Sequence, residues 1–246
     1  MNQLSLYPLS ESAITLQYGE EIAINRHREL LQLMQHIKDD PFPGFREVSI
    51  AFHTLTIFFD PYTVFENVKQ SPINYISEWL HKKASWLGND IPDAKTSATI
   101  TVASREQLIP VCYEMPFAFD LDTLAAYHGI DPETVISMHT NQTFYVFMVG
   151  FTPGFPYMGI LPPALDTPRK ATPSLMVPAG SVGIAGQQTG IYPFTSPGGW
   201  NIIGRTPIKL FDINDNDPCL LKAGDRVRFS RIDRSTFNYL NQYEDS

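Results

Sequence analysis

Hydrophobic and polar positions change period several times in the N-terminal third of the chain. Residues 14–18 alternate with the period of a strand, and residues 21–38 repeat apolar positions every three to four residues, as a helix does. Two β-rich runs, 48–52 and 55–59, predict a hairpin. Ser71-Pro72 then opens a second helical period. This part of the chain therefore predicts a small α/β unit of order βαββα.

The pattern changes after a polar, turn-forming stretch at residues 88–93. We place a domain boundary there, with a small α/β domain at residues 1–90 and a second domain at residues 91–246. Short helices are expected at residues 121–128 and 132–139. The expected strands of the second domain are 98–103, 109–113, 144–150, 182–184, 202–203, 208–211 and 226–229. Such strands suggest a closed or nearly closed β-barrel, and the chain falls in the α+β class.

Between Gly150 and Pro207 the chain holds most of its glycines and half of its prolines, with aromatic residues threaded among them. Glycine permits positive φ and close approach to the backbone, whereas proline fixes φ and removes a donor. Flexible linkers share this composition but lack the aromatic side chains. The segment therefore predicts rigid loops that build an ordered site.

Composition narrows the class of protein. The chain has 246 residues, of which 43% are hydrophobic and 18% charged, and no run approaches the roughly 18 apolar residues of a membrane span. The N-terminus lacks the pattern of a secretory signal, so we expect a soluble, cytoplasmic protein without a membrane partner. Cys112 and Cys219 are expected to be reduced thiols, and the histidine spacings predict no metal site.

The net charge of −8 is unevenly distributed, because residues 106–168 contain acidic side chains but no Lys or Arg. Within this stretch, residues 121–139 resemble a helix-turn-helix with Gly129 at the turn. A recognition helix needs cations for phosphates and suitable side chains for bases. We therefore expect no binding to nucleic acid, and regard the acidic stretch as a solvated face or a face for a basic partner.

Residues 179–183 (AGSVG) nearly match the nucleophile elbow, in which a serine lies between a strand and a helix. Gly186 and Gly190 disfavour a helix there, so Ser181 is interpreted as a turn residue or a hydrogen-bond donor. The dipeptide Gly-Lys does not occur in the sequence, so the chain has no Walker phosphate loop.

Three residues are predicted to be catalytic. Arg169 and Arg205 are the arginines of the Gly/Pro-rich segment, and a guanidinium suits the capture of a carboxylate or a phosphate. His139 ends a predicted helix and could transfer a proton or simply place a cation at a helix C-terminus. The predicted ligand-binding residues, whose aromatic members could equally belong to the core, are Gly154, Phe155, Tyr157, Gly180, Ser181, Gly183, Gln187, Gln188, Thr189, Tyr192, Ser196, Gly198, Gly199, Trp200 and Asn201.

Four motifs follow one another in this segment. They are GFTPGFPYMG (150–159), VPAGSVGIAG (177–186), QTGIYP (188–193) and SPGGWN (196–201). With these motifs the chain resembles the family of 5-oxoprolinase B subunits, known also as allophanate hydrolase subunit 1. The family includes histidine-kinase inhibitors of the KipI type, and a related domain occurs in urea carboxylase. The resemblance is strongest from about residue 113 to residue 229.

The resemblance implies a small α/β domain followed by a cyclophilin-like β-barrel. It also implies work with two other subunits, of the A and C types, to hydrolyse 5-oxo-L-proline to L-glutamate with ATP as co-substrate. A resonance-stabilised lactam is a poor electrophile, and phosphorylation would make its oxygen a leaving group. The arginines would then orient the substrate carboxylate or stabilise phosphoryl charge, His139 would handle a proton, and N–H groups near Gly180, Gly183 and Gly198 would form an anion nest.

Two other functions stay open at this stage. An aromatic cleft could hold a proline-containing segment of a sensor histidine kinase, as the inhibitor branch of the family is thought to do. A subunit acting on urea-derived carboxylated amides ranks third, because the sequence shows no amidase motif or biotin carrier. The lack of a phosphate loop favours an active site shared between subunits.

Overall fold

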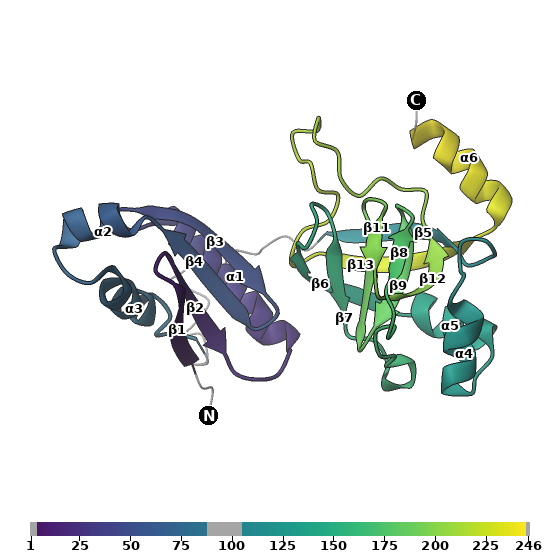
Figure 1. Ribbon diagram of the computed structural model, residues 1–246, viewed down its shortest axis with the longest axis horizontal. Helices are drawn as coiled ribbons and strands as arrows, with labels where there is room; N and C mark the ends of the chain where they lie inside the picture. The colour runs from purple at the N-terminus through teal and green to yellow at the C-terminus, as the bar shows by residue number, and fades with distance from the viewer. Residues whose placement is uncertain (1–3, 88–104, 245–246) are drawn as a thin grey trace, which may run out of the picture. The chain divides into compact units, whose positions relative to one another are not determined.

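The computed structural model describes residues 4–87 and 105–244 (Figure 1). The chain divides into two compact units, Met1–Val102 and Ala103–Ser246. The predicted boundary at residues 88–93 and the predicted strand at residues 98–103 lie outside the described residues, so both stay predictions.

The first unit is an antiparallel four-stranded sheet with helices packed on it. The strand order is β1-β2-β4-β3, and α1 contacts β3 and β4 while α3 contacts β2. The strands are β1 (Leu4–Ser10), β2 (Ala13–Tyr18), β3 (Phe45–Ala51) and β4 (Thr54–Phe59), and the helices are α1 (Ile24–Asp39), α2 (Pro61–Val68) and α3 (Pro72–Lys83).

The unit therefore contains the predicted strands and helices, but adds β1 and α2 to the predicted order. Helix α2 begins directly after the predicted strand 55–59. Asp60 caps it, because the Asp60 side chain accepts a hydrogen bond from the backbone N–H of Thr63 at 3.0 Å. The edge strand β1 has mostly exposed side chains and contains Pro8, so it carries no clear alternation.

The second unit is a closed seven-stranded barrel, which confirms the predicted fold class. Its strand order is β10-β7-β6-β13-β5-β12-β9, with β5 and β13 parallel and the other pairs antiparallel. The strands are β5 (Glu106–Cys112), β6 (Thr143–Val149), β7 (Pro156–Gly159), β9 (Ser181–Ala185), β10 (Gln188–Ile191), β12 (Asn201–Arg205) and β13 (Arg226–Ile232).

The strand predicted at residues 208–211 is wrong. Only Phe211 is bridged there, to Cys219, and the residues between them form polar turns in which Asp212 accepts from the N–H of Asn214 at 2.9 Å. Side-chain acceptors of this kind favour turns over a strand ladder.

Helices α4 (Leu121–His128) and α5 (Pro132–Thr140) lie together against the barrel (Figure 1). Helix α4 contacts β12 and α5 contacts β13, and Leu124 and Val135 are buried in the barrel core. The helix-turn-helix pattern therefore contributes its apolar face to the barrel core.

Further elements of this unit stand outside the seven barrel strands. They are a two-stranded sheet of β8 (Ser174–Val177) and β11 (Ser196–Gly198), a short 3-10 helix η1 (Pro163–Leu165) and the C-terminal helix α6 (Arg234–Glu244). A separate hydrophobic cluster is formed by Phe155, Val177, Ala185, Tyr192, Trp200 and Ile202. The Gly/Pro-rich segment therefore builds a core of its own outside the barrel interior.

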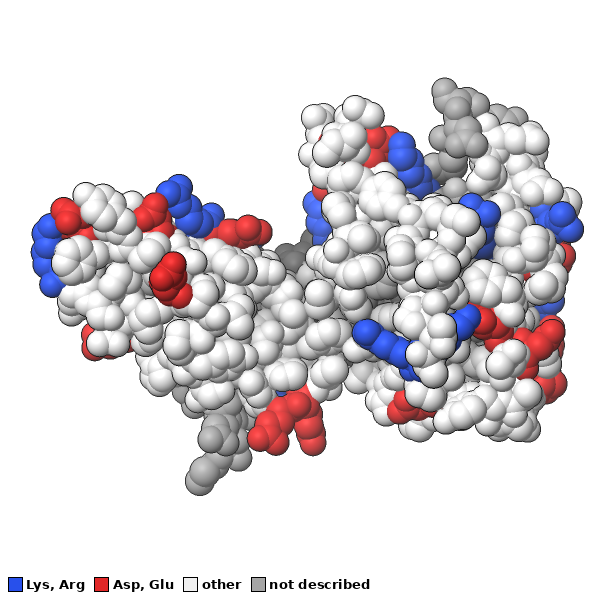
Figure 2. Space-filling view, viewed as in Figure 1, with Lys and Arg blue, Asp and Glu red and all other residues white. Residues whose placement is uncertain are grey.

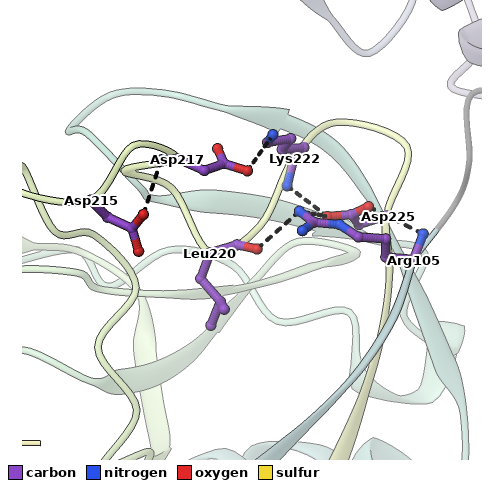
Figure 3. Close-up of polar contacts among 6 residues, drawn as sticks. All are labelled: Arg105, Asp215, Asp217, Leu220, Lys222 and Asp225. Atoms are coloured by element: carbon purple, nitrogen blue, oxygen red, sulfur yellow. Dashed lines mark hydrogen bonds and ion pairs between the residues drawn. The ribbon is translucent and has the colours of Figure 1, made fainter.

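A polar cluster fixes Arg105, which directly precedes β5 (Figure 3). The Asp225 side chain is 5% exposed and accepts from the backbone N–H groups of Arg105, at 3.3 Å, and Lys222, at 2.9 Å. It also forms an ion pair with the Arg105 guanidinium at 3.3 Å, and that guanidinium donates to the carbonyl oxygen of Leu220. Asp225 therefore ties the start of β5 to the turn before β13.

The sequence analysis expected two reduced cysteines and no membrane span. Cys112 is buried and Cys219 is partly buried, and both are free thiols. Across the described parts of the chain, no helix combines the length and the apolar character needed to cross a membrane.

Candidate functional site

The predicted aromatic residues come together around Phe155. Its ring is 1% exposed, and its centroid lies 4.8 Å from that of Tyr157, 5.2 Å from Tyr192 and 5.5 Å from Trp200. The rings meet at steep or tilted angles, which aromatic pairs prefer. Most of this aromatic cluster is core, and only Tyr157 among these four is partly open to solvent.

Phe151 lies at the edge of the aromatic cluster and was missing from the predicted site. Its side chain is 69% exposed, and its ring centroid is 5.9 Å from that of Phe155. Its φ of 69° is in the left-handed region, which costs a non-glycine residue about 1 kcal/mol. The turn-forming TPG that follows Phe151 in the sequence was the available sign of this unusual backbone.

Arg169 lies at the same edge. It is exposed, and its charge opposes the rise that burial causes in the pKa of Tyr157 and of Tyr192. The chain beside it is fixed, because the Asn201 side-chain amide donates to the Pro168 carbonyl oxygen at 3.0 Å. The structure thus brings Arg169 and Asn201 to the aromatic cluster.

Lys170 and Asp120 form a partly buried ion pair that sequence reasoning missed. The Lys170 ammonium lies 2.8 Å from Asp120 Oδ1, while Asp120 Oδ2 accepts from the backbone N–H of Ile202 at 2.8 Å. The backbone N–H of Lys170 donates to the Gly199 carbonyl oxygen at 2.8 Å. Since Asp120 precedes Lys170 by 50 residues, only the basic dipeptide 169–170 hinted at the pair.

Arg205 lies away from Arg169, at the opposite end of β12 from Asn201. Asn201 and Arg205 are four positions apart along the strand, or about 13 Å. The Arg205 Nε donates to the carbonyl oxygen of Ala179 at 2.7 Å, and its guanidinium lies near the rings of Phe117 and Phe237. The two predicted arginines therefore belong to different places on the barrel.

His139 lies inside the barrel and is 0% exposed. Its ring stacks on Phe229 with centroids 4.4 Å apart, and its nitrogens lie 2.9 Å from the Tyr113 hydroxyl and 3.0 Å from Thr189 Oγ1. Burial lowers its pKa to about 3, so the imidazole is neutral near pH 7. This geometry gives no support to proton transfer with a substrate, and His139 acts as a polar member of the core.

The predicted glycine nest is not formed. The Gly180 N–H donates to the Tyr192 carbonyl oxygen at 2.7 Å, and Gly183 lies within β9. Gly198 lies in β11, where an added Cβ would overlap the Tyr192 hydroxyl. These glycines serve close packing between layers.

The other predicted residues divide between core and surface. Ser181 opens β9 and is 1% exposed, and β10 rather than a helix follows that strand, so the nucleophile elbow is absent there. Thr189 is buried in β10, and Gln187 donates to Asp166 at 3.1 Å. Gly154 lies in the turn before β7, and Gln188 lies in β10. Ser196 lies in β11, and Gly199 lies in the turn after that strand.

Neither a metal cluster nor one basic patch emerges from the described ranges. No group of three or more His, Cys, Asp or Glu side chains in residues 4–87 and 105–244 is arranged to hold a metal ion. Figure 2 shows the Lys and Arg side chains of the barrel unit as separate groups on the face in view.

Comparison with known proteins places this fold in a class. Residues 4–221 match the family described as carboxyltransferase domain, subdomain C and D. The 5-oxoprolinase B subunit of Bacillus subtilis (strain 168) is 40% identical over 233 residues, which cover 94% of this chain and 93% of that protein. The 5-oxoprolinase B subunit of Haemophilus influenzae (strain ATCC 51907 / DSM 11121 / KW20 / Rd) is 38% identical over 226 residues, covering 92% and 97%. The chain belongs to the family of 5-oxoprolinase B subunits.

Solved structures agree with this fold. TTHA0988 is 32% identical with a TM-score of 0.71, and the match covers 90% of this chain but only 40% of that longer one. PH0987 from Pyrococcus horikoshii is 32% identical with a TM-score of 0.53, covering 95% and 100%. The urea carboxylase of Kluyveromyces lactis has a TM-score of 0.76 at 20% identity, covering 99% and 23%, and shows the fold alone.

Proposed function

We propose that this chain is the B subunit of a cytoplasmic, ATP-dependent 5-oxoprolinase, in which it acts with two other subunits to hydrolyse 5-oxo-L-proline to L-glutamate. One observation carries the proposal. Relatives named as B subunits of 5-oxoprolinase are 35% to 40% identical to the chain over more than nine-tenths of both partners. The aligned regions cover more than nine-tenths of the chain, so they extend over most of both compact units.

The chemistry explains why ATP is needed. Resonance makes the lactam carbonyl of 5-oxoproline a poor electrophile. Transfer of the ATP γ-phosphoryl group to the lactam oxygen forms a P–O bond and releases ADP. The phosphorylated oxygen activates the ring carbon, so that water attacks this carbon and the C–N bond breaks. Hydrolysis of the resulting acyl phosphate then gives glutamate and phosphate.

The charges on this chain favour an ATP site shared with a partner subunit. The triphosphate needs several cations close together. Lys170 is already neutralised by Asp120, and Arg169 and Arg205 lie at different places on the barrel. In the proposed complex, Arg169 at the exposed edge of the aromatic cluster stabilises phosphoryl charge that the partner brings.

The test measures ATP-dependent release of glutamate from 5-oxo-L-proline by the chain co-purified with its two partner subunits. Arg169→Gln should lower kcat by about ten- to a hundredfold, because a charge-assisted contact to the phosphoryl group is lost. Arg228→Gln is the matched control, since this exposed arginine lies on β13 away from the aromatic cluster. Failure of the wild-type subunits to associate, or an intact complex that forms no glutamate, would overturn the proposal.

A further inference from the structure

Leu175 and Met176 are neighbours in β8, and both side chains are open to solvent. Leu175 is 91% exposed and Met176 is 71% exposed. Among the large hydrophobic side chains exposed in the described residues, these two form the only pair adjacent in sequence, and Leu175 is the most exposed. Neighbouring side chains of a strand point to opposite faces. Strand β8 therefore presents apolar side chains to solvent on both of its faces.

One edge of β8 is open as well. Its ladder partner is β11, where Ser196 lies opposite Val177. No other strand in the described ranges pairs with β8. An open edge with apolar side chains is a template for a strand from another chain, because main-chain hydrogen bonds supply affinity and side-chain pockets supply specificity.

The open strand is held on a rigid support. Val177, at the end of β8, is 0% exposed and belongs to the aromatic cluster with Tyr192 and Trp200. Strand β11 packs as closely on that cluster, since a Cβ added at Gly198 would overlap the Tyr192 hydroxyl. Strand β8 is thus already formed, so a partner need not order it on binding.

Strand β8 begins beside Arg169. The ammonium of Lys170, which follows Arg169 in the sequence, lies 3.2 Å from Ser174 Oγ at the start of β8. The backbone N–H of Lys170 donates at 2.8 Å to the carbonyl oxygen of Gly199, directly after β11. A chain that pairs with β8 therefore lies close to the exposed edge of the aromatic cluster at which Arg169 stands.

This position favours a partner subunit over a second copy of the chain. In the proposed function, a partner brings phosphoryl charge to Arg169. A second copy paired through β8 would instead bring a second Arg169 to the same interface, where the like charges repel and no anion offsets them. TTHA0988 agrees with a different partner, because the match covers only 40% of it, so the same fold occurs there with a larger second part in one chain.

We propose that β8 is the docking strand for the partner subunit that brings the phosphoryl group, an inference that rests on the proposed function. An extended segment of that subunit pairs with the open edge of β8, and its apolar side chains cover Leu175 and Met176. The docked subunit then lies at the Arg169 edge, which brings its phosphoryl group close to the guanidinium.

The first experiment measures the affinity of the full chain for its partner subunits by titration calorimetry. Leu175→Asp and Met176→Asp each place a charge at the proposed apolar contact, so Kd should rise about ten- to a hundredfold. Ile213→Asp is the matched control, because Ile213 is 76% exposed in the turns between Phe211 and Cys219. All three variants should melt as the wild type does. An unchanged Kd in both β8 variants would overturn the proposal.

Hydrogen exchange locates the contact without any substitution. The amides of residues 175–176 should gain protection when the partner subunits bind, while those of residues 213–216 exchange as before. Protection elsewhere with none in β8 would contradict the docking strand. Sedimentation of the chain alone tests the other occupant. A dimer that Leu175→Asp dissociates would assign β8 to a second copy and refute the proposal.

Activity of the complete complex separates this inference from the proposed function. With Leu175→Asp, glutamate formation should recover as the partner concentration is raised, because docking alone is weakened, whereas Arg169→Gln should stay impaired at every concentration. An active complex that assembles equally well with the β8 variants refutes the docking strand but leaves the oxoprolinase function intact. A complex that assembles through β8 but forms no glutamate does the reverse. Subunits that never associate refute both.

Discussion

The hydroxyl oxygen of Tyr113 lies 2.9 Å from Nδ1 of His139, inside the closed barrel. The tautomer follows from the next contact. Thr189 Oγ1 donates to the Gly183 carbonyl oxygen at 3.1 Å, so it accepts from the N–H at His139 Nε2. Nδ1 therefore accepts from Tyr113, and the ring is neutral with both nitrogens satisfied.

Removing the Tyr113 hydroxyl should destabilise the barrel. In Tyr113→Phe, Nδ1 of His139 keeps its burial but loses its donor, which should lower the free energy of unfolding by about 1–3 kcal/mol. Urea unfolding followed by circular dichroism measures the change. Tyr127→Phe, at a side chain that is 63% exposed, should stay within about 0.5 kcal/mol. Equal effects of the two changes would contradict the hydrogen-bonded core.

His139 should also make stability depend on pH. Burial lowers its pKa from 6.5 to about 3, so between these values the unfolded chain binds a proton that the folded chain does not. The free energy of unfolding should therefore fall as the pH drops from about 6.5 toward 3, by at most about 1.4 kcal/mol per pH unit from this group.

The measurement compares urea midpoints of the wild type and His139→Gln across this pH window. The variant lacks the titrating group, so its stability should decline less steeply toward acid, whatever its value at neutral pH. Parallel curves for the two proteins would show that His139 is protonated equally in the folded and unfolded states.

Asp225 should contribute strongly to the stability of the barrel. Asp225→Ala leaves the N–H groups of Arg105 and Lys222 without their acceptor and breaks the ion pair to Arg105. We expect a loss of about 3 kcal/mol. The matched control is Asp217→Ala, which removes an ion pair to Lys222 whose side chains are about half exposed and should cost less than about 1 kcal/mol (Figure 3). Thermal unfolding of both variants provides the comparison.

Gly180 and Gly186 allow the cost of a positive φ to be separated from the cost of a steric overlap. Their φ values are 80° and 56°, but an added Cβ at Gly180 would overlap the Thr206 carbonyl oxygen, while that at Gly186 meets no atom within 4 Å. Gly186→Ala should therefore cost about 1 kcal/mol from backbone conformation alone. Gly180→Ala should cost about 1–3 kcal/mol more because of the overlap. A smaller loss at position 180 than at position 186 in chemical denaturation would refute this account.

Elements stabilised by residues close together in the sequence were predicted more accurately than features that depend on residues far apart in the sequence. Helices α4 and α5 were predicted because their caps and apolar faces are local, as in Asp131, which accepts from the Thr134 N–H at 2.9 Å. Helix α6 was missed because Phe237 and Leu240 are too few apolar positions to stand out as a helical period in a polar sequence.

The candidate site shows the same division. The aromatic cluster around Phe155 comes from one dense segment, so composition alone pointed to it. The partners of Arg205 come from a loop before α4 and from α6, and Asp120 meets Lys170 from 50 residues away. His139 stood in a plausible place for catalysis, but nothing local in its sequence showed that the closed barrel would bury it completely.

The parallel pairing of β5 with β13 determines when the barrel can close. Glu106 lies opposite Arg226 and Cys112 opposite Ile232, so the first and last barrel strands are neighbours. During synthesis the nascent barrel must therefore keep β5 and β6 as unpaired edges until β13 leaves the ribosome. A chain cut short before Arg226 would expose both edges and would depend on chaperones to avoid aggregation.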